Sequence, residues 1–174
     1  MAPLVRRTWA PRGSGPTLFH KGRHREKVSV AAALWLTPNR DRVELFTQTL
    51  VNGYFNNQRI APFLTALSNE IDEPLVVVWD GGGPHKGDPI RALERSRRGE
   101  VWLEQLPAYG SELMPVEQLW TWLKYDRLAN FAPHDALELD AAVNVELERA
   151  GRDQERLRNF FHASRLPLPR ALLI

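Results

Sequence analysis

The sequence predicts an α/β domain with a mixed sheet, and three observations lead to this fold class. Two apolar, partly β-branched runs, 28–36 and 43–50, flank a turn signal, and a short continuously apolar run follows at 75–79. Helical periodicity lies between and after these runs. Two strands, then alternating helix and strand, then helices are the order expected of an α/β domain. The chain has 174 residues, of which 43% are hydrophobic, which suits one ordinary domain.

The first half of the chain predicts an antiparallel hairpin, a helix and a buried strand. Thr37-Pro38-Asn39 closes the first apolar run, so that 28–36 and 43–50 pair as a hairpin. A helix is expected over 54–71, although Pro62 should kink or delay it. Its apolar positions recur at helical spacing: Ile60, Phe63, Leu64 and Leu67. The run 75–79 is typical of a strand that is buried on both faces.

The second half predicts a charged helix at 88–98, a strand at 100–105, and a helix from Pro115 to about Tyr125. Asp135 with Glu138 three residues later forms a capping-box pattern, which indicates the start of a further helix. Gly151 is expected to end that helix, and 153–162 predicts another.

Composition excludes several function classes. No run of eighteen apolar residues and no signal-peptide pattern is present, so we expect a cytoplasmic protein without a membrane segment. The absence of cysteine excludes disulfides, thiol catalysis and cysteine-based zinc sites.

Positive charge is concentrated at the start of the chain, in residues 1–27. Seven basic residues minus one acid, Glu26, give this segment a charge of +6, and the overall +2 leaves −4 for the remainder. Basic strips of this kind commonly bind nucleic-acid phosphates, although a solvated or disordered arm is an equal alternative. The candidate DNA-binding residues are Arg6, Arg7, Arg12, Lys21, Arg23, Arg25 and Lys27.

Two carboxylates are the candidate catalytic and metal-binding residues. Asp80 follows the buried strand 75–79 and opens a glycine-rich turn, at the sheet edge where α/β proteins bind ligands. Carboxylate oxygens suit Mg²⁺, but Asp also commonly begins turns. Glu117 lies 37 positions later on the helix from Pro115. At about 100° per residue it shares a face with Lys124, opposite the apolar face. An ordinary solvated face is the alternative.

Several motifs together resemble the catalytic core of the Tc1/mariner-like transposases, and in particular their bacterial insertion-sequence relatives. They are DGGGPH at 80–85, LPAY at 106–109, SEL at 111–113, PVE at 115–117 and WTWLK at 120–124. The match covers at least 28–131 and is specific as an ordered set. It implies a ribonuclease-H-like mixed sheet flanked by helices.

The resemblance implies metal-dependent cleavage and transfer of DNA strands, with Mg²⁺ or Mn²⁺ as cofactor. Asp80 would be the second metal-binding acid and Glu117 the third. His85 would be the histidine after the turn, or simply a residue that organises the next helix, and Lys124 a contact to the DNA backbone. The implied partners are the transposon ends and the target DNA, with a homodimer as the complete form.

Three departures from the family pattern stand out. Gly81 and Met114 replace residues that are usually Asn, and no acid precedes Glu26. We therefore expect the first strand and its Asp to be missing, and little or no cleavage by this chain alone. An upstream portion of the transposase is then an expected partner, with Met1 as an internal start of a longer or frameshifted product. The expected divisions are a basic strip at 1–27, a partial catalytic core at 28–131, and a helical extension at 132–174.

Two alternative functions remain at this point. The first is an inactive transposase remnant that binds DNA through its basic strip. The second is a small-molecule enzyme in which the glycines at 81–83 hold a phosphate, and it is weak because no Gly-Lys-Ser/Thr signature is present.

Overall fold

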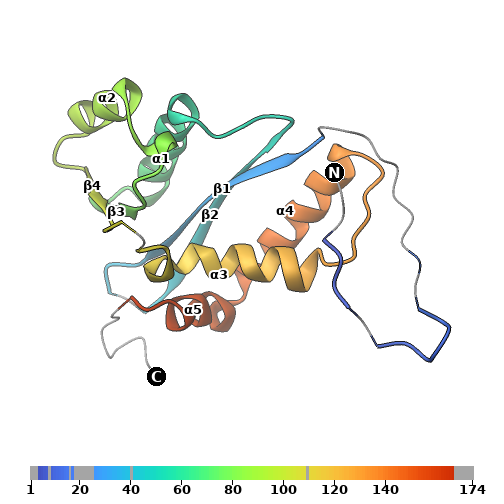
Figure 1. Ribbon diagram of the computed structural model, residues 1–174. Helices are drawn as coiled ribbons and strands as arrows, with labels where there is room; N and C mark the ends of the chain where they lie inside the picture. The colour runs from blue at the N-terminus through green and yellow to red at the C-terminus, as the bar shows by residue number, and fades with distance from the viewer. Residues whose placement is uncertain are drawn as a thin grey trace.

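The computed structural model describes residues 4–7, 9–15, 17, 26–39, 41–108 and 110–166. Its strands are β1 (Val28–Leu36), β2 (Val43–Val51), β3 (Leu75–Trp79) and β4 (Val101–Gln105). Its α-helices are α1 (Asn57–Ile71), α2 (Asp88–Ser96), α3 (Pro115–Thr121), α4 (Ala136–Arg152) and α5 (Gln154–Ala163) (Figure 1). Two 3₁₀ turns, Gly83–His85 and Gly110–Leu113, and a π-helical turn, Trp122–Arg127, complete the set.

The strands form two pairs in place of one continuous mixed sheet. β1 and β2 are antiparallel, in a register that places Val28 opposite Val51 and Leu36 opposite Val43. β3 and β4 are parallel, with Leu75 beside Val101. Among the described residues, no ladder joins one pair to the other. The expected hairpin is present, and β3 occupies the position of the strand expected at 75–79. This strand is not buried on both faces as expected, because Val76 and Val78 are 60% and 50% exposed. Within the described part of the chain, no strand connects the two pairs.

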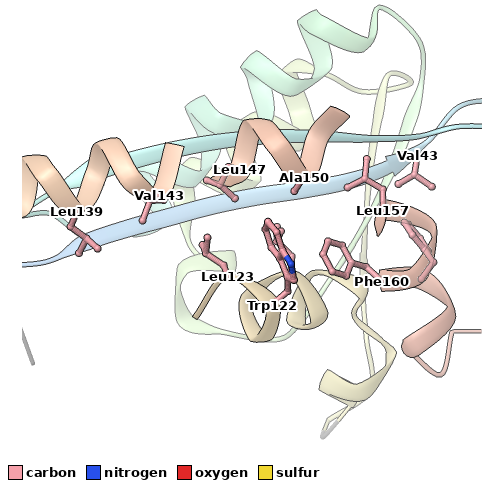
Figure 2. Packing of buried hydrophobic residues seen from close by; sticks show 11 residues of the cluster. Val43, Trp122, Leu123, Leu139, Val143, Leu147, Ala150, Leu157 and Phe160 are labelled. Atoms are coloured by element: carbon pink, nitrogen blue, oxygen red, sulfur yellow. The ribbon is translucent and has the colours of Figure 1, made fainter. Parts of the chain in front are cut away.

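Two hydrophobic clusters lie on opposite faces of the hairpin. Residues that alternate along β1 divide between them, because successive side chains of a strand point to opposite faces. Ala31, Ala33 and Trp35 pack toward α1 and α2, together with Val77 and Trp79 of β3. The other face of the hairpin packs on α3, α4 and α5. Figure 2 shows Leu139, Val143, Leu147 and Ala150 along α4, facing Trp122 and Leu123, with Leu157 and Phe160 from α5.

Apolar side chains buried in this second cluster hold α4 and α5 against the β1–β2 hairpin. Leu119, Leu157 and Val43 are fully buried, and each such side chain contributes about 1.5–3 kcal/mol relative to an exposed position. Gln154 at the start of α5 adds a polar contact, since its side-chain amide exchanges hydrogen bonds with the backbone of Val43 at 2.8 and 3.2 Å.

α1 and α4 both begin at a side-chain cap, but neither start matches the prediction in every detail. α1 begins at Asn57, three residues after the expected start, because the Asn56 side chain caps it, and it runs through Pro62. Asp135 caps α4 by accepting hydrogen bonds from the N–H groups of Leu137 and Glu138. The Glu138 carboxylate accepts from the His134 N–H, one residue before the position that a capping box requires.

Gly151 does not end α4, which continues to Arg152. A Cβ at Gly151 would lie 4.0 Å from the Leu45 Cβ of β2, so the glycine lies where helix and strand pack closely. Asp153 ends α4 and caps α5 by accepting from the Arg156 N–H.

None of the helices in the described ranges is both long enough and apolar enough to cross a membrane.

Candidate active site at the carboxyl end of β3

Asp80 follows the last residue of β3, and its side chain is 54% exposed. Its Oδ1 accepts a hydrogen bond from the Gly82 N–H at 2.8 Å, so Asp80 does begin a turn, as the simpler interpretation expected. The same oxygen lies 2.8 Å from Nδ1 of His85. No hydrogen bond to Oδ2 is found within the described ranges, so this carboxylate oxygen is free to bind a ligand.

His85 holds this turn from the end of the 3₁₀ segment Gly83–His85. Its ring stacks on Trp79, with centroids 4.4 Å apart and planes at 7°. Nδ1 lies 2.9 Å from the backbone carbonyl oxygen of Asp80 as well as 2.8 Å from its carboxylate. Both contacts require that Nδ1 carries the proton. His85 is therefore placed to fix the orientation of Asp80, which neither sequence interpretation of this histidine specified.

The glycines of the turn give room to neighbouring polar groups. A Cβ at Gly81 would collide with the side-chain amide of Gln105, and one at Gly82 would lie 2.8 Å from Asp80 Oδ1. Gln105 thus occupies the space beside Gly81, where the related family usually carries an Asn side chain. Sequence reasoning missed Gln105, because its place beside the turn depends on the pairing of β4 with β3, which has no local sequence signal.

Glu117 occupies the first turn of α3, with an exposed side chain. A carboxylate in the first turn is favoured by the unpaired N–H groups and the dipole of the helix. Met114 precedes this turn in extended conformation and provides no side-chain cap. The departure from Asn at this position therefore leaves α3 uncapped.

The chain leaves β4 beside Asp80, because the Leu106 N–H donates to the Trp79 carbonyl oxygen at 2.8 Å. It then passes through the turn Gly110–Leu113 into α3. Asp80 therefore lies beside the start of the segment that leads from Leu106 to Glu117. No hydrogen bond or ion pair joins the two acids, and in the part of the chain that the structure describes, no group of three His, Cys, Asp or Glu could hold a metal.

Lys124 lies in the π-helical turn where an α-helix was expected. The wider turn is closed by the Leu128 N–H, which donates to the Leu123 carbonyl five residues earlier at 2.9 Å. Such turns are frequent at functional sites. Lys124 is exposed and lines a cavity of about 500 Å³ beside Val28, Ser29 and Val30 of β1. It is therefore associated with the edge of β1, and no described contact links it to Asp80.

The π-helical turn is tied to α4 by an ion-pair network that the sequence did not reveal. Glu146 is 11% exposed, and its carboxylate accepts from Arg127 Nε and from Arg149 Nη1, each at 2.6 Å. The hydrogen bond from Arg127 holds the pKa of Glu146 below its ordinary value, against the opposing effect of burial. The same hydrogen bond raises the pKa of Arg127.

The basic strip is only partly available for ligands. Arg6 forms an ion pair with Asp126 at 2.6 Å, and Asn130 hydrogen-bonds to the backbone of Leu4 and Arg6. Residues 4–7 and 9 are not part of a strand. Arg7 and Arg12 are exposed. Lys27 lies over the Tyr54 ring. Lys21, Arg23 and Arg25 lie outside the described residues.

Comparison with solved structures confirms the ribonuclease-H-like fold class. The chain is similar to a structure described as the Mos1 transposase paired-end complex with left transposon end, at 14% identity and a TM-score of 0.60 over 93% of this chain and 47% of that one. It is also similar to the Mos1 mariner paired-end complex with Mn, at 18% identity and a TM-score of 0.62 over 98% and 49%.

This chain thus spans about half the length of these solved chains. Among curated protein sequences, none matches it. A family model described as DDE superfamily endonuclease matches residues 2–139, well over half of the sequence. The resemblance first indicated by the motifs around Asp80 and Glu117 is confirmed at this level: the chain belongs to the DDE superfamily endonucleases.

Proposed function

We propose that this chain is the catalytic-domain portion of a Tc1/mariner-like DNA transposase, which cleaves and transfers DNA strands in a metal-dependent reaction when complete. The observation that carries this proposal is the Asp80 carboxylate at the end of β3. One of its oxygens is fixed by Gly82 and His85, and the other is open. This arrangement lies within the segment that matches the endonuclease family.

The donor set suits Mg²⁺ or Mn²⁺ in kind, because Asp80 and Glu117 offer exposed carboxylate oxygens. These two residues would hold the metal. When bound, it would activate a water or a 3′-hydroxyl and stabilise the leaving oxygen. A third carboxylate is required for full activity, which explains why we expect little cleavage by this chain alone. The related Mos1 complex is described as containing Mn, which supports the choice of ion.

The chain's own residues orient the Asp80 carboxylate and provide positive charge for DNA. His85 keeps the Asp80 carboxylate in one position through Nδ1, and its stacking on Trp79 restrains the ring. The exposed side chains of Arg7, Arg12 and Lys124 are candidates for contacts with DNA phosphates. Arg6 is a weaker candidate than the sequence indicated, because it is paired with Asp126.

The proposed partners are transposon-end and target DNA, an upstream portion of the transposase, and a second copy in the complete form. Both solved structures are described as paired-end complexes, one of them with a transposon end, which supports the DNA part of this proposal. Binding to DNA without cleavage is the alternative function, which the exposed Arg7 and Arg12 favour.

The first prediction concerns metal binding by the chain. A titration with Mn²⁺ followed by electron paramagnetic resonance should show binding that Asp80→Asn weakens by about tenfold or more, since one of two ligands loses its charge. His85→Ala should weaken it less, because Asp80 remains but its orientation relaxes. Asp72→Asn, on an exposed acid at the end of α1, is the matched control and should leave Mn²⁺ binding unchanged.

The same preparation is also tested for DNA cleavage. The substrate is a supercoiled plasmid that carries the DNA flanking the gene, and the measured quantity is the nicked fraction. The chain alone should nick little. Robust nicking that Asp80→Ala abolishes would contradict the need for a third carboxylate. Salt-dependent DNA binding, with no Mn²⁺ bound at Asp80, would favour the DNA-binding alternative.

A further inference from the structure

We propose that the side-chain amide of Gln105 binds a phosphate oxygen of DNA beside the Asp80 carboxylate. Gln105 is the last residue of β4 and lies opposite Trp79 in the parallel register, so its side chain starts beside the residue that precedes Asp80. The inference rests on the proposed function for the identity of its ligand, and it adds a phosphate-binding residue to that site.

The Gln105 side chain is directed at the turn that follows β3. A Cβ at Gly81 would lie 3.9 Å from the Gln105 Cγ, 3.2 Å from its Cδ and nearer still to its Nε2. The distance shortens along the side chain, so the amide end points at Gly81 with its nitrogen foremost. Gln105 therefore reaches from β4 to β3 and covers the residue that follows Asp80.

Gly81 provides the space that this amide occupies. Among the described residues, the glycines with positive φ are Gly13, Gly87 and Gly99, so the backbone of Gly81 does not itself require glycine. The nearest atoms to a methyl group at position 81 all belong to the Gln105 side chain. A larger residue at position 81 would therefore displace the Gln105 amide and little else.

The amide and the Asp80 carboxylate lie on the same turn. A Cβ at Gly82 would lie 2.8 Å from Asp80 Oδ1, and the Gln105 amide lies against Gly81. Consecutive Cα atoms are about 3.8 Å apart, so the two polar groups cover neighbouring residues. A metal ion on the free Asp80 oxygen would hold its other oxygen ligands about 2.1 Å away. A phosphate that shared this ion with Asp80 would then lie beside the amide.

The Gln105 amide is free to bind a ligand. The side chain is exposed, and within the described ranges neither its nitrogen nor its oxygen makes a hydrogen bond. The nitrogen has two N–H donors, and Gln side chains commonly donate to phosphate oxygens in protein–DNA complexes. An amide also suits this position because it has no charge. A Lys or Arg here would form an ion pair with Asp80 and compete with a metal ion.

Binding of a short fluorescein-labelled DNA duplex to the full chain, measured by fluorescence anisotropy, tests the contact. Gln105→Leu removes the amide at nearly the same volume. It should weaken binding by about tenfold in Mn²⁺, because a hydrogen bond to a charged group is lost. In EDTA the loss should be about threefold, since no ion then draws the phosphate to Asp80. Gln48→Leu, at an exposed glutamine of β2, is the matched control and should leave DNA binding unchanged.

A second variant removes the contact and keeps Gln105 in the chain. The methyl group of Gly81→Ala takes the space of the amide, so this variant should weaken DNA binding as Gln105→Leu does. The double variant Gly81→Ala/Gln105→Leu should bind no more weakly than either single variant, because both remove the same interaction. Gly83→Ala is the matched control in the same turn. A Cβ there meets no atom within 4 Å, and DNA binding should be unchanged.

Three further measurements separate a hydrogen bond from a structural role. The urea midpoint of Gln105→Leu should equal that of the native chain, because the side chain is exposed. Its Mn²⁺ affinity without DNA should also be unchanged, since Gln105 is not a ligand of the ion. In EDTA the loss of DNA affinity should be the same at every salt concentration, because an uncharged amide releases no counterions.

Several results would overturn the proposal. One is DNA binding by Gln105→Leu that equals that of the native chain, with and without Mn²⁺. Others are losses that multiply in the double variant, or a loss in Gly83→Ala as large as that in Gly81→Ala. A fall in Mn²⁺ affinity in Gln105→Leu would show that the residue acts through Asp80, and not on the phosphate.

The phosphate contact and the proposed catalytic function fail in distinguishable ways. Mn²⁺ binding that Asp80→Asn removes, together with unchanged DNA binding in Gln105→Leu, would refute the contact and leave the function standing. Absence of Mn²⁺ binding at Asp80 would count against the metal-dependent function. The comparison in EDTA then decides the contact alone, because a threefold loss in Gln105→Leu supports it and equal binding refutes it.

Discussion

At the scale of single residues, the structure separates side chains that orient from those that bind. His85 uses Nδ1 for both the backbone and the carboxylate of Asp80, and its ring for Trp79. Asp80 keeps one oxygen open. The sequence placed Asp80 correctly at the end of a strand, because a short apolar run followed by a glycine-rich turn is a local signal. The part of Gln105 was not predictable, since its contact with the turn depends on how β4 pairs with β3.

Glu146 provides the second prediction. Its pKa is lowered by the hydrogen bond from Arg127, so its contribution to stability is present above the ordinary Glu pKa of about 4.3 and is lost as pH falls through the lowered value. Glu146→Gln should reduce the free energy of unfolding at pH 7 by about 1–2 kcal/mol, a figure kept small because Arg127 is partly exposed. The difference from the native chain should shrink as pH falls toward 3, in urea titrations.

The control for this prediction is Glu148→Gln, on the same helix. Among the described residues, Glu148 pairs only with the exposed Arg152, at 3.4 Å, and its loss should change stability little. A Glu146→Gln defect of constant size from pH 7 to pH 3 would contradict the assignment to the charged carboxylate.

At the scale of elements, the sequence predicted those features that depend on residues a few positions apart. The hairpin and the Asp135 cap were predicted because turn residues and capping side chains act within a few positions. The π-helical turn was not predicted, because its apolar periodicity also suits an α-helix. The Arg127–Glu146 ion pair that ties this turn to α4 joins residues 19 positions apart, which leaves no local signal. Gly151 was misinterpreted as a helix end, since its close approach to Leu45 is a tertiary contact.

The third prediction addresses the uncapped start of α3. Met114 already has the extended backbone of an N-cap residue, with φ −94° and ψ 110°, but its thioether accepts no hydrogen bond. Met114→Asn should raise the free energy of unfolding by about 0.5–1 kcal/mol, because the amide oxygen can accept from a free N–H of the first turn. Met114→Ala should give no such gain. Equal stability of the Asn and Ala variants in urea titrations would show that the first turn of α3 has no N–H group in need of a cap.

At the scale of the whole molecule, the arrangement of helices around the strands is uneven. Within the described ranges, helices cover both faces of the β1–β2 hairpin but only one face of the β3–β4 pair. On the other face Val76, Val78 and Trp102 are exposed, the last at 46%. The sequence suggested a strand buried on both faces at 75–79, because a continuous apolar run is typical of one. It is buried on one face within the described residues, because Val76 and Val78 on the other face are 60% and 50% exposed.

The fourth prediction compares the two faces of β3 by one matched exchange of Val for Thr. Val78→Thr, on the uncovered face, should change the free energy of unfolding of the chain by less than about 0.5 kcal/mol. Val77→Thr, against α1, should cost about 1–3 kcal/mol, because it places a hydroxyl among apolar neighbours. Urea titration measures both. Equal costs would show that the outer face of β3 is covered in solution.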